Sequence, residues 1–257
     1  MNIFQTIAAD FGALALFGAL AVMFMGGFTK GVVGFALPMI SVSGIGSIMT
    51  ADMAILALLL PGLVTNVWQA FRSGVLSAMD SLRTYWRIFA IMPVVLAMAA
   101  QAFTVMSDAQ LFLVLGVVVI AFAVLELSGF RGAIKGRSPK LELLAGFVSG
   151  ICGGLSGVWG PPIMLYLMAK DTLKIEFVQT MGLVFLVGAV VLNLSHINSG
   201  LLSAHSAPFS ALMIVPALAG MWLGYRVQDK LDQAKFRKAT LFVLLLAGLN
   251  LLRRGLV

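Results

Sequence analysis

The sequence predicts an all-α integral membrane protein made of two inverted-topology repeats, each a Gly/Pro-broken helix hairpin followed by three transmembrane helices. Three observations predict this fold. With 61% hydrophobic and 11% charged residues, the 257-residue chain has too little polar surface to coat a water-soluble globule. Apolar runs of about 17 to 25 residues, long enough to cross a hydrocarbon core of about 30 Å, fill it almost end to end. One Gly/Pro pattern occurs twice inside these runs.

The repeated pattern is GFTKGVVGFALP, which starts at Gly27, and GICGGLSGVWGP, which starts at Gly150. The differences 150−27, 154−31, 157−34 and 161−38 all equal 123. A single GxxxG favours close helix packing. Two copies at one offset, each followed by proline, favour broken helices, which mark substrate sites in secondary transporters.

The first repeat covers residues 1–128 and is followed by a basic cytoplasmic linker, 129–140. Its broken pair, joined by a turn at the glycines, and its three helices lie near 9–28, 31–49, 51–69, 86–105 and 111–128. The second, inverted repeat covers 141–257. Its broken pair and three helices lie near 141–155, 158–169, 177–196, 207–226 and 239–252.

The loop charges predict the sidedness. If the N-terminus is outside and each broken pair returns to its own side, 14 of 17 Lys and Arg residues are cytoplasmic. If each pair crosses once and the N-terminus is inside, 9 positive residues are inside and 8 are outside, so the positive-inside rule favours the first arrangement. The loop 70–87 has three arginines and its counterpart 197–206 has no Lys or Arg, which indicates inversion. The cytoplasmic residues are Arg72, Arg83, Arg87, Arg131, Lys135, Arg137, Lys140, Lys170, Lys174, Arg226, Lys230, Lys235, Arg237 and Lys238.

The breaks predict an anion site. Half-helix N-termini present free N–H donors and a partial positive charge, and Lys30 is the only basic residue in the first 71 positions. The alternatives are that Lys30 snorkels to an interface and that Asn66 and Asn193 bond only between helices. The predicted substrate-binding residues are Gly27, Thr29, Lys30, Gly31, Gly34, Gly150, Gly154, Ser156, Gly157, Trp159, Asn66 and Asn193.

Other function classes fit less well. The basic residues are dispersed in loops and form no stripe for nucleic acid. No nucleophile, acid/base or metal constellation predicts catalysis, a metal or a cofactor. The expected partners are a small anionic substrate and the lipid bilayer, and a homodimer is left open. Without an ATP-binding motif, a proton or ion gradient or a separate ATPase subunit would supply the energy.

These residues resemble the TauE/SafE sulfite exporter family, also called the sulfonate permease family. The resemblance rests on MGGFTKGVVGFALPMIS, its echo GFVSGICGGLSGVWGPPIM, the basic central loop and the length. It implies transport of sulfite, an organosulfonate or a related sulfur-containing anion across the bacterial inner membrane. We therefore expect a multi-pass secondary transporter, an exporter, that works by alternating access with its site at the broken-helix tips. A passive anion channel and an intramembrane enzyme are the alternatives.

Overall fold

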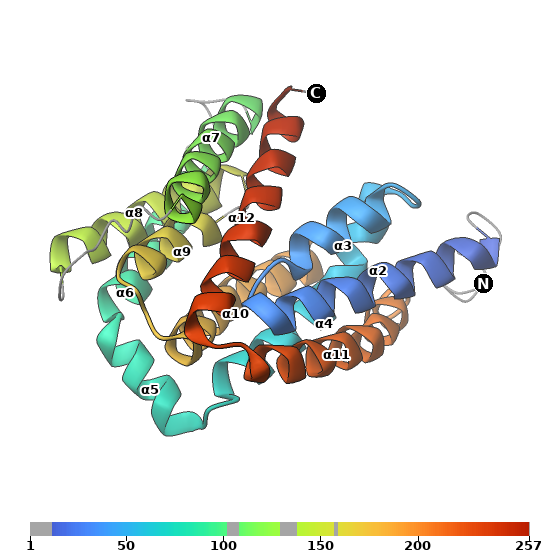
Figure 1. Ribbon diagram of the computed structural model, residues 1–257. Helices are drawn as coiled ribbons and strands as arrows, with labels where there is room; N and C mark the ends of the chain where they lie inside the picture. The colour runs from blue at the N-terminus through green and yellow to red at the C-terminus, as the bar shows by residue number, and fades with distance from the viewer. Residues whose placement is uncertain (1–11, 102–107, 129–137, 157–158, 257) are drawn as a thin grey trace. The chain divides into compact units, whose positions relative to one another are not determined.

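The computed structural model describes residues 12–101, 108–128, 138–156 and 159–256, which are helical almost throughout and include no strand. The all-α prediction is confirmed. The helices, drawn in Figure 1, are α2 (Gly12–Val33), α3 (Leu37–Gly46), α4 (Ala51–Phe71), α5 (Val75–Thr84), α6 (Trp86–Gln101), α7 (Asp108–Leu127), α8 (Pro139–Ser156), α9 (Gly160–Ala169), α10 (Lys174–Asn198), α11 (Ala207–Lys230) and α12 (Gln233–Leu256).

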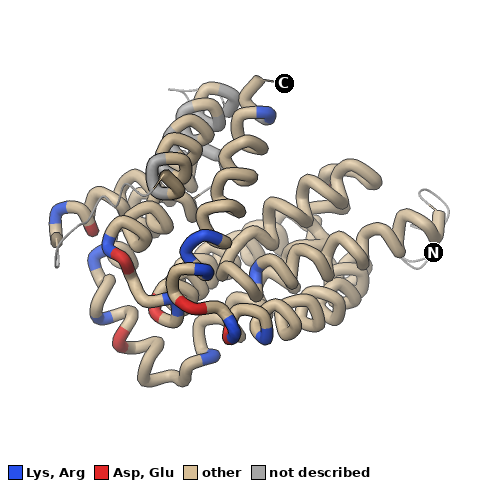
Figure 2. Tube along the Cα trace, viewed as in Figure 1, with Lys and Arg blue, Asp and Glu red and all other residues tan. Residues whose placement is uncertain are grey.

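Within the described residues, four helices are long and apolar enough to cross a membrane: α2, α4, α10 and α11. A fifth span results if α5 and α6, bent by 74° at their junction, are counted as one. Large apolar side chains such as Phe17, Met98 and Val215 are exposed on helix surfaces, as expected where lipid replaces water. Charged residues lie mainly at helix ends and in the connections between helices (Figure 2).

Helix α5 was not predicted, because the sequence gives a connecting loop over 70–87. Its ten residues, VLSAMDSLRT, are too short and too polar to register as a span. They form an amphipathic helix, with Ala78 and Ser81 buried and Asp80 and Arg83 exposed.

By contact, the chain divides into two compact units, and each takes helices from both halves of the sequence. Unit 1 contains Met1–Arg72 and Phe185–Asp232, and unit 2 contains Ser73–Val184 and Gln233–Val257. The predicted repeats 1–128 and 141–257 divide the chain in another way and stay a prediction. Most of the predicted linker lies outside the described residues, and α8 already begins at Pro139.

Several helix bounds recur at the offset of 123. Helix α3 spans 37–46 and α9 spans 160–169, α4 and α10 start at 51 and 174, and α2 and α8 end at 33 and 156. In unit 1, α2 packs along α11, and in unit 2, α8 packs along α6. These pairs occupy corresponding places in the two halves.

Glycine contacts give the direction of the packed helices. Gly220 meets Phe24 and Gly224 meets Phe28, so α2 and α11 run parallel (Figure 1). In unit 2, Gly116 meets Leu252 whereas Gly248 meets Ile120, so α7 and α12 run antiparallel. The antiparallel pair matters for the topology because α7 and α12 are corresponding helices of the two predicted repeats.

Candidate functional site

The first hairpin folds back as predicted, but it breaks later than the sequence indicates. Helix α2 continues through Gly27 and Gly31, and α3 begins only at Leu37. The chain turns at Gly34 and Ala36, whose φ angles are 88° and 84°. The left-handed conformation at this turn favours glycine, which Gly34 supplies. The predicted break between the helices 9–28 and 31–49 is therefore wrong in position, because α2 runs on through Gly31 to Val33.

Gly27 and Gly31 instead allow α2 to approach α11. A Cβ placed on either glycine would lie 2.2 Å or 2.3 Å from a backbone carbonyl oxygen of α11. Helix α11 contributes Gly220 and Gly224 to the same interface. Small residues spaced by four bring two helix backbones together, which is the packing role that GxxxG has in membranes. The backbone N–H groups of Gly27 and Gly31 are therefore inside a helix and are not free donors.

Lys30 lies near the end of α2 and is 2% exposed. Its Nζ donates to the Thr65 hydroxyl oxygen at 2.9 Å and to the side-chain carbonyl oxygen of Asn66. Thr65 donates its own proton to the Pro61 carbonyl oxygen at 2.6 Å, so its oxygen acts as an acceptor toward Lys30. Thr65 and Asn66 are buried side chains of α4. We call Lys30, Thr65 and Asn66 the Lys30 cluster.

The Lys30 cluster contains no negative charge. Both groups that accept from Lys30 are neutral, and no ion pair within the described residues includes Lys30. A charged ammonium in a membrane-spanning helix is costly unless an anion or water compensates it. The cluster is therefore a place where an anion would gain more than a cation.

The start of α3 lies on the same face of α2 as Lys30. Gly26, four residues before Lys30, packs against Leu37 and Ser41, since a Cβ there would lie 3.0 Å from Leu37 Cδ1. No side chain caps the N-terminus of α3, and Pro38 occupies its first turn. An uncapped first turn has N–H groups without helical partners.

Two glutamine side chains hold the other side of the break. Gln69 of α4 donates from Nε2 to the Gly34 carbonyl oxygen at 2.7 Å, and Gln228 of α11 donates from Nε2 to the Val32 carbonyl oxygen at 3.0 Å. The last carbonyl groups of a helix lack intrahelical partners. Both glutamines are buried, and they supply two of the missing donors where α2 ends.

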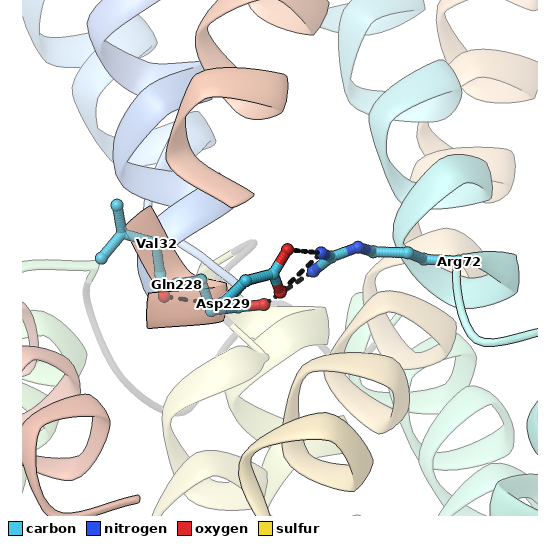
Figure 3. A network of polar contacts seen from close by, with 4 residues as sticks. All are labelled: Val32, Arg72, Gln228 and Asp229. Carbon is cyan, nitrogen blue, oxygen red and sulfur yellow. Dashed lines mark hydrogen bonds and ion pairs between the residues drawn. The ribbon is translucent and has the colours of Figure 1, made fainter. Parts of the chain in front are cut away.

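Arg72 fixes the orientation of Gln228. Its Nη1 donates to Gln228 Oε1 at 2.9 Å, and Nη2 donates to both carboxylate oxygens of Asp229 at 2.7 Å (Figure 3). The guanidinium also stacks 3.8 Å from the centre of the Tyr225 ring. With Oε1 occupied by Arg72, the amide of Gln228 turns Nε2 toward Val32. We call Asp229, Arg72, Gln228 and the Val32 carbonyl the Arg72 relay.

The second hairpin, α8 and α9 in unit 2, has different chemistry. The Ser149 hydroxyl donates to the Trp159 carbonyl oxygen across the break, and no side chain caps α9. Gly150 and Gly154 lie inside α8, where the predicted bounds 141–155 and 158–169 also place them. A Cβ on Gly150 would lie 2.9 Å from the Met92 carbonyl oxygen of α6, so Gly150 serves packing.

The remaining predicted site residues are placed as follows. Thr29 donates its hydroxyl proton to the Met25 carbonyl oxygen of its own helix at 3.0 Å. Asn193 of α10 donates from Nδ2 to the backbone oxygens of Leu59 and Ala189, and neither acceptor belongs to the Lys30 cluster. Ser156 is the last residue of α8, and its side chain, like Gly157, lies outside the described residues.

Sequence reasoning brought Lys30 and Asn66 into one site but missed three members of the surroundings. Thr65 was not singled out, although it adjoins Asn66 in an apolar helix. Gln69 was not among the predicted substrate-binding residues. Gln228 lies in a polar stretch near the end of α11, and nothing in that stretch predicted its contact with the end of α2. Among the described residues, no group of three His, Cys, Asp or Glu is placed to hold a metal.

Comparison with known proteins agrees with the resemblance seen in the sequence. A sequence model of the family described as sulfite exporter TauE/SafE matches residues 19–251, which is most of the chain. No curated protein and no solved structure matches it.

Proposed function

Since the chain belongs to the TauE/SafE sulfite exporter family, a family of membrane transporters, we propose that it exports sulfite, a sulfonate or a related small sulfur-containing anion across the bacterial inner membrane. The proposed mechanism is secondary transport by alternating access. The anion binds beside the Lys30 cluster at the break between α2 and α3.

One observation carries this assignment: Lys30 is buried and has only neutral acceptors. A bound oxyanion would supply the missing negative charge, and the charge-assisted bond would be stronger than one between neutral groups. Sulfite and sulfonates present three oxygens, so one oxygen can accept from Nζ while the others remain available to further donors.

The start of α3 supplies further donors for such an anion. Its uncapped first turn contributes backbone N–H groups and the positive end of the helix dipole. Leu37 packs one turn away from Lys30 on the same face of α2. The full positive charge of Lys30 and the partial positive charge at the start of α3 therefore favour an anion in the same region.

Alternating access rests on the proposed inverted repeats. The recurring helix bounds support a repeat, and the antiparallel packing of α7 against α12 supports its inversion. If each broken pair crossed the membrane once, α7 and α12 would run in the same direction.

Counterflow in proteoliposomes tests the function. Purified protein is reconstituted into vesicles loaded with unlabelled sulfite, thiosulfate or sulfoacetate, and uptake of the labelled anion is measured against protein-free vesicles. We expect saturable exchange that a second anion of this set inhibits. Exchange that does not saturate would indicate a channel. Absence of exchange for all three anions would contradict the proposed function.

A further inference from the structure

We propose that Lys30 binds a proton together with the anion, so that one proton crosses the membrane with each anion. A dianion then leaves the cell as a pair with one net negative charge, which a membrane potential negative inside drives outward. This inference rests on the proposed function, and it names the coupling ion of that same site. It follows from the number of donors and acceptors in the Lys30 cluster and from the charges on the helices around it.

The existing contacts satisfy a neutral amine. A neutral lysine has two N–H donors and one lone pair, whereas an ammonium has three donors. Nζ makes two hydrogen bonds, to Thr65 and Asn66. Thr65 cannot donate to the lone pair while its proton is bonded to the Pro61 carbonyl oxygen. Without an anion, the cluster therefore pairs both donors of a neutral amine.

A third donor has no acceptor within the described residues, and an anion provides one. Protonation places a full charge in a buried site and is favourable only when a counterion arrives. Binding of the anion and binding of the proton thus favour each other. By linkage, the proton increases the affinity for the anion by the same factor as the anion increases the affinity for the proton.

The neighbouring helices offer no fixed counterion. Helix α3 has no titratable residue, and Asp52 and Arg72 lie exposed at opposite ends of α4. On α11, Asp229 is paired with Arg72, and Arg226 and Lys230 are exposed. Tyr225 is buried, but its ring packs under Arg72. The transported anion is therefore the group that neutralises the positive charge of protonated Lys30.

The step is a simple proton transfer. On one side of the membrane the lone pair of Nζ takes a proton from water, and the anion accepts a hydrogen bond from the resulting ammonium. On the other side the anion leaves and the ammonium returns the proton to water. No bond of the anion breaks and no electrons are transferred.

Proton uptake on binding tests the proposal directly. Thiosulfate and sulfoacetate keep a constant charge between pH 6 and 8, so any proton taken up belongs to the protein. Calorimetric titration in buffers of different ionisation enthalpy gives the number of protons bound per anion. At pH 8 we expect about one proton per anion in the wild-type protein, falling as the pH is lowered. Binding without proton uptake at pH 8 would overturn the coupling.

Three substitutions distinguish a permanent positive charge at position 30 from a charge that appears only when Lys30 binds a proton. Lys30→Arg keeps a permanent positive charge, so it should bind anion without proton uptake. Lys30→Gln should lose about tenfold to a hundredfold in affinity. Asn66→Asp places a carboxylate beside Lys30, which should replace the anion and weaken its binding. Lys230→Arg, on an exposed residue, is the matched control and should behave as wild type.

Transport distinguishes failure of the coupling from failure of the function. In proteoliposomes, a pH gradient should drive accumulation of thiosulfate by the wild-type protein, and Lys30→Arg should exchange anion but not accumulate it. Wild-type exchange that ignores the gradient would refute the coupling and leave the proposed function standing. Absence of wild-type exchange would refute both. Gradient-driven accumulation by Lys30→Arg would show that another group carries the proton.

Discussion

At the residue scale, the end of α2 depends on side chains that come from other helices. Gln69 and Gln228 donate to carbonyl groups that the end of the helix leaves unpaired. Arg72 orients Gln228, and Asp229 orients Arg72. The Arg72 relay thus links a carboxylate that is mostly exposed to the turn of helix that carries Lys30.

Arg72→Met should destabilise the protein more than Arg83→Met does. Arg72 makes a two-pronged contact with Asp229 and holds Gln228, so its loss should cost about 1 to 3 kcal/mol. Arg83 is 73% exposed and its pair with Asp80 is three residues away on one helix, so its loss should cost less than about 1 kcal/mol. Thermal unfolding in detergent compares the two. Equal shifts would show that the relay adds no stability.

Individual residues also show which contacts could not be predicted from the sequence. The sequence identified Lys30 because a lone charge in an apolar segment is costly. It could not identify Thr65 as a partner, because that contact joins residues 35 positions apart and depends on how α2 and α4 meet. Asn193 has the same side-chain chemistry as Asn66, and only the fold shows that its amide bonds elsewhere.

At the scale of elements, both hairpins were predictable, as was the break point of the second, but the break point of the first was not. Gly/Pro spacing predicts α2 with α3 and α8 with α9, and the observed bounds agree within a few residues. The same spacing is compatible with a turn and with close packing. The choice depends on the partner helix. Gly27 and Gly31 pack because α11 presents Gly220 and Gly224 at the same level.

This packing predicts a contrast among glycines. Gly31→Ala and Gly224→Ala would place a Cβ 2.3 Å and 2.2 Å from backbone oxygens of the facing helix, so each should destabilise the protein by about 1 to 3 kcal/mol. Gly62→Ala is the control, since its Cβ would meet only Leu58 at 3.7 Å. Thermal unfolding measures all three. Equal unfolding temperatures for the three variants would contradict the close approach of α2 and α11.

At the scale of the whole molecule, the proposed inverted topology rests on the positive residues and on the direction of one helix pair. The loop charges predict an external N-terminus and two inverted halves. The antiparallel packing of α7 with α12 is what that topology requires. The sequence could not predict how helices of the two halves combine into compact units, because α2 with α11 and α7 with α12 pair across most of the chain.

The topology predicts opposite accessibility for two connections. The chain has a single cysteine, Cys152, which is buried, so a Cys152→Ser background allows single-cysteine labelling. Ser73→Cys should react only from the cytoplasmic side, and Ser199→Cys should react only from outside. Both positions are exposed. Labelling of intact cells with a membrane-impermeant maleimide distinguishes them. Reaction of both from one side would disprove the inversion.

The central claim is that Lys30 provides the positive charge that binds the anion. Calorimetric titration of sulfite into wild type, Lys30→Gln and Lys230→Gln at constant pH tests it most directly. Lys30→Gln should lose about tenfold to a hundredfold in affinity, since one charge-assisted hydrogen bond contributes about 1.5 to 3 kcal/mol. Lys230→Gln removes the same charge from an exposed position of α11 and should match wild type. Unchanged sulfite affinity in Lys30→Gln would contradict the claim.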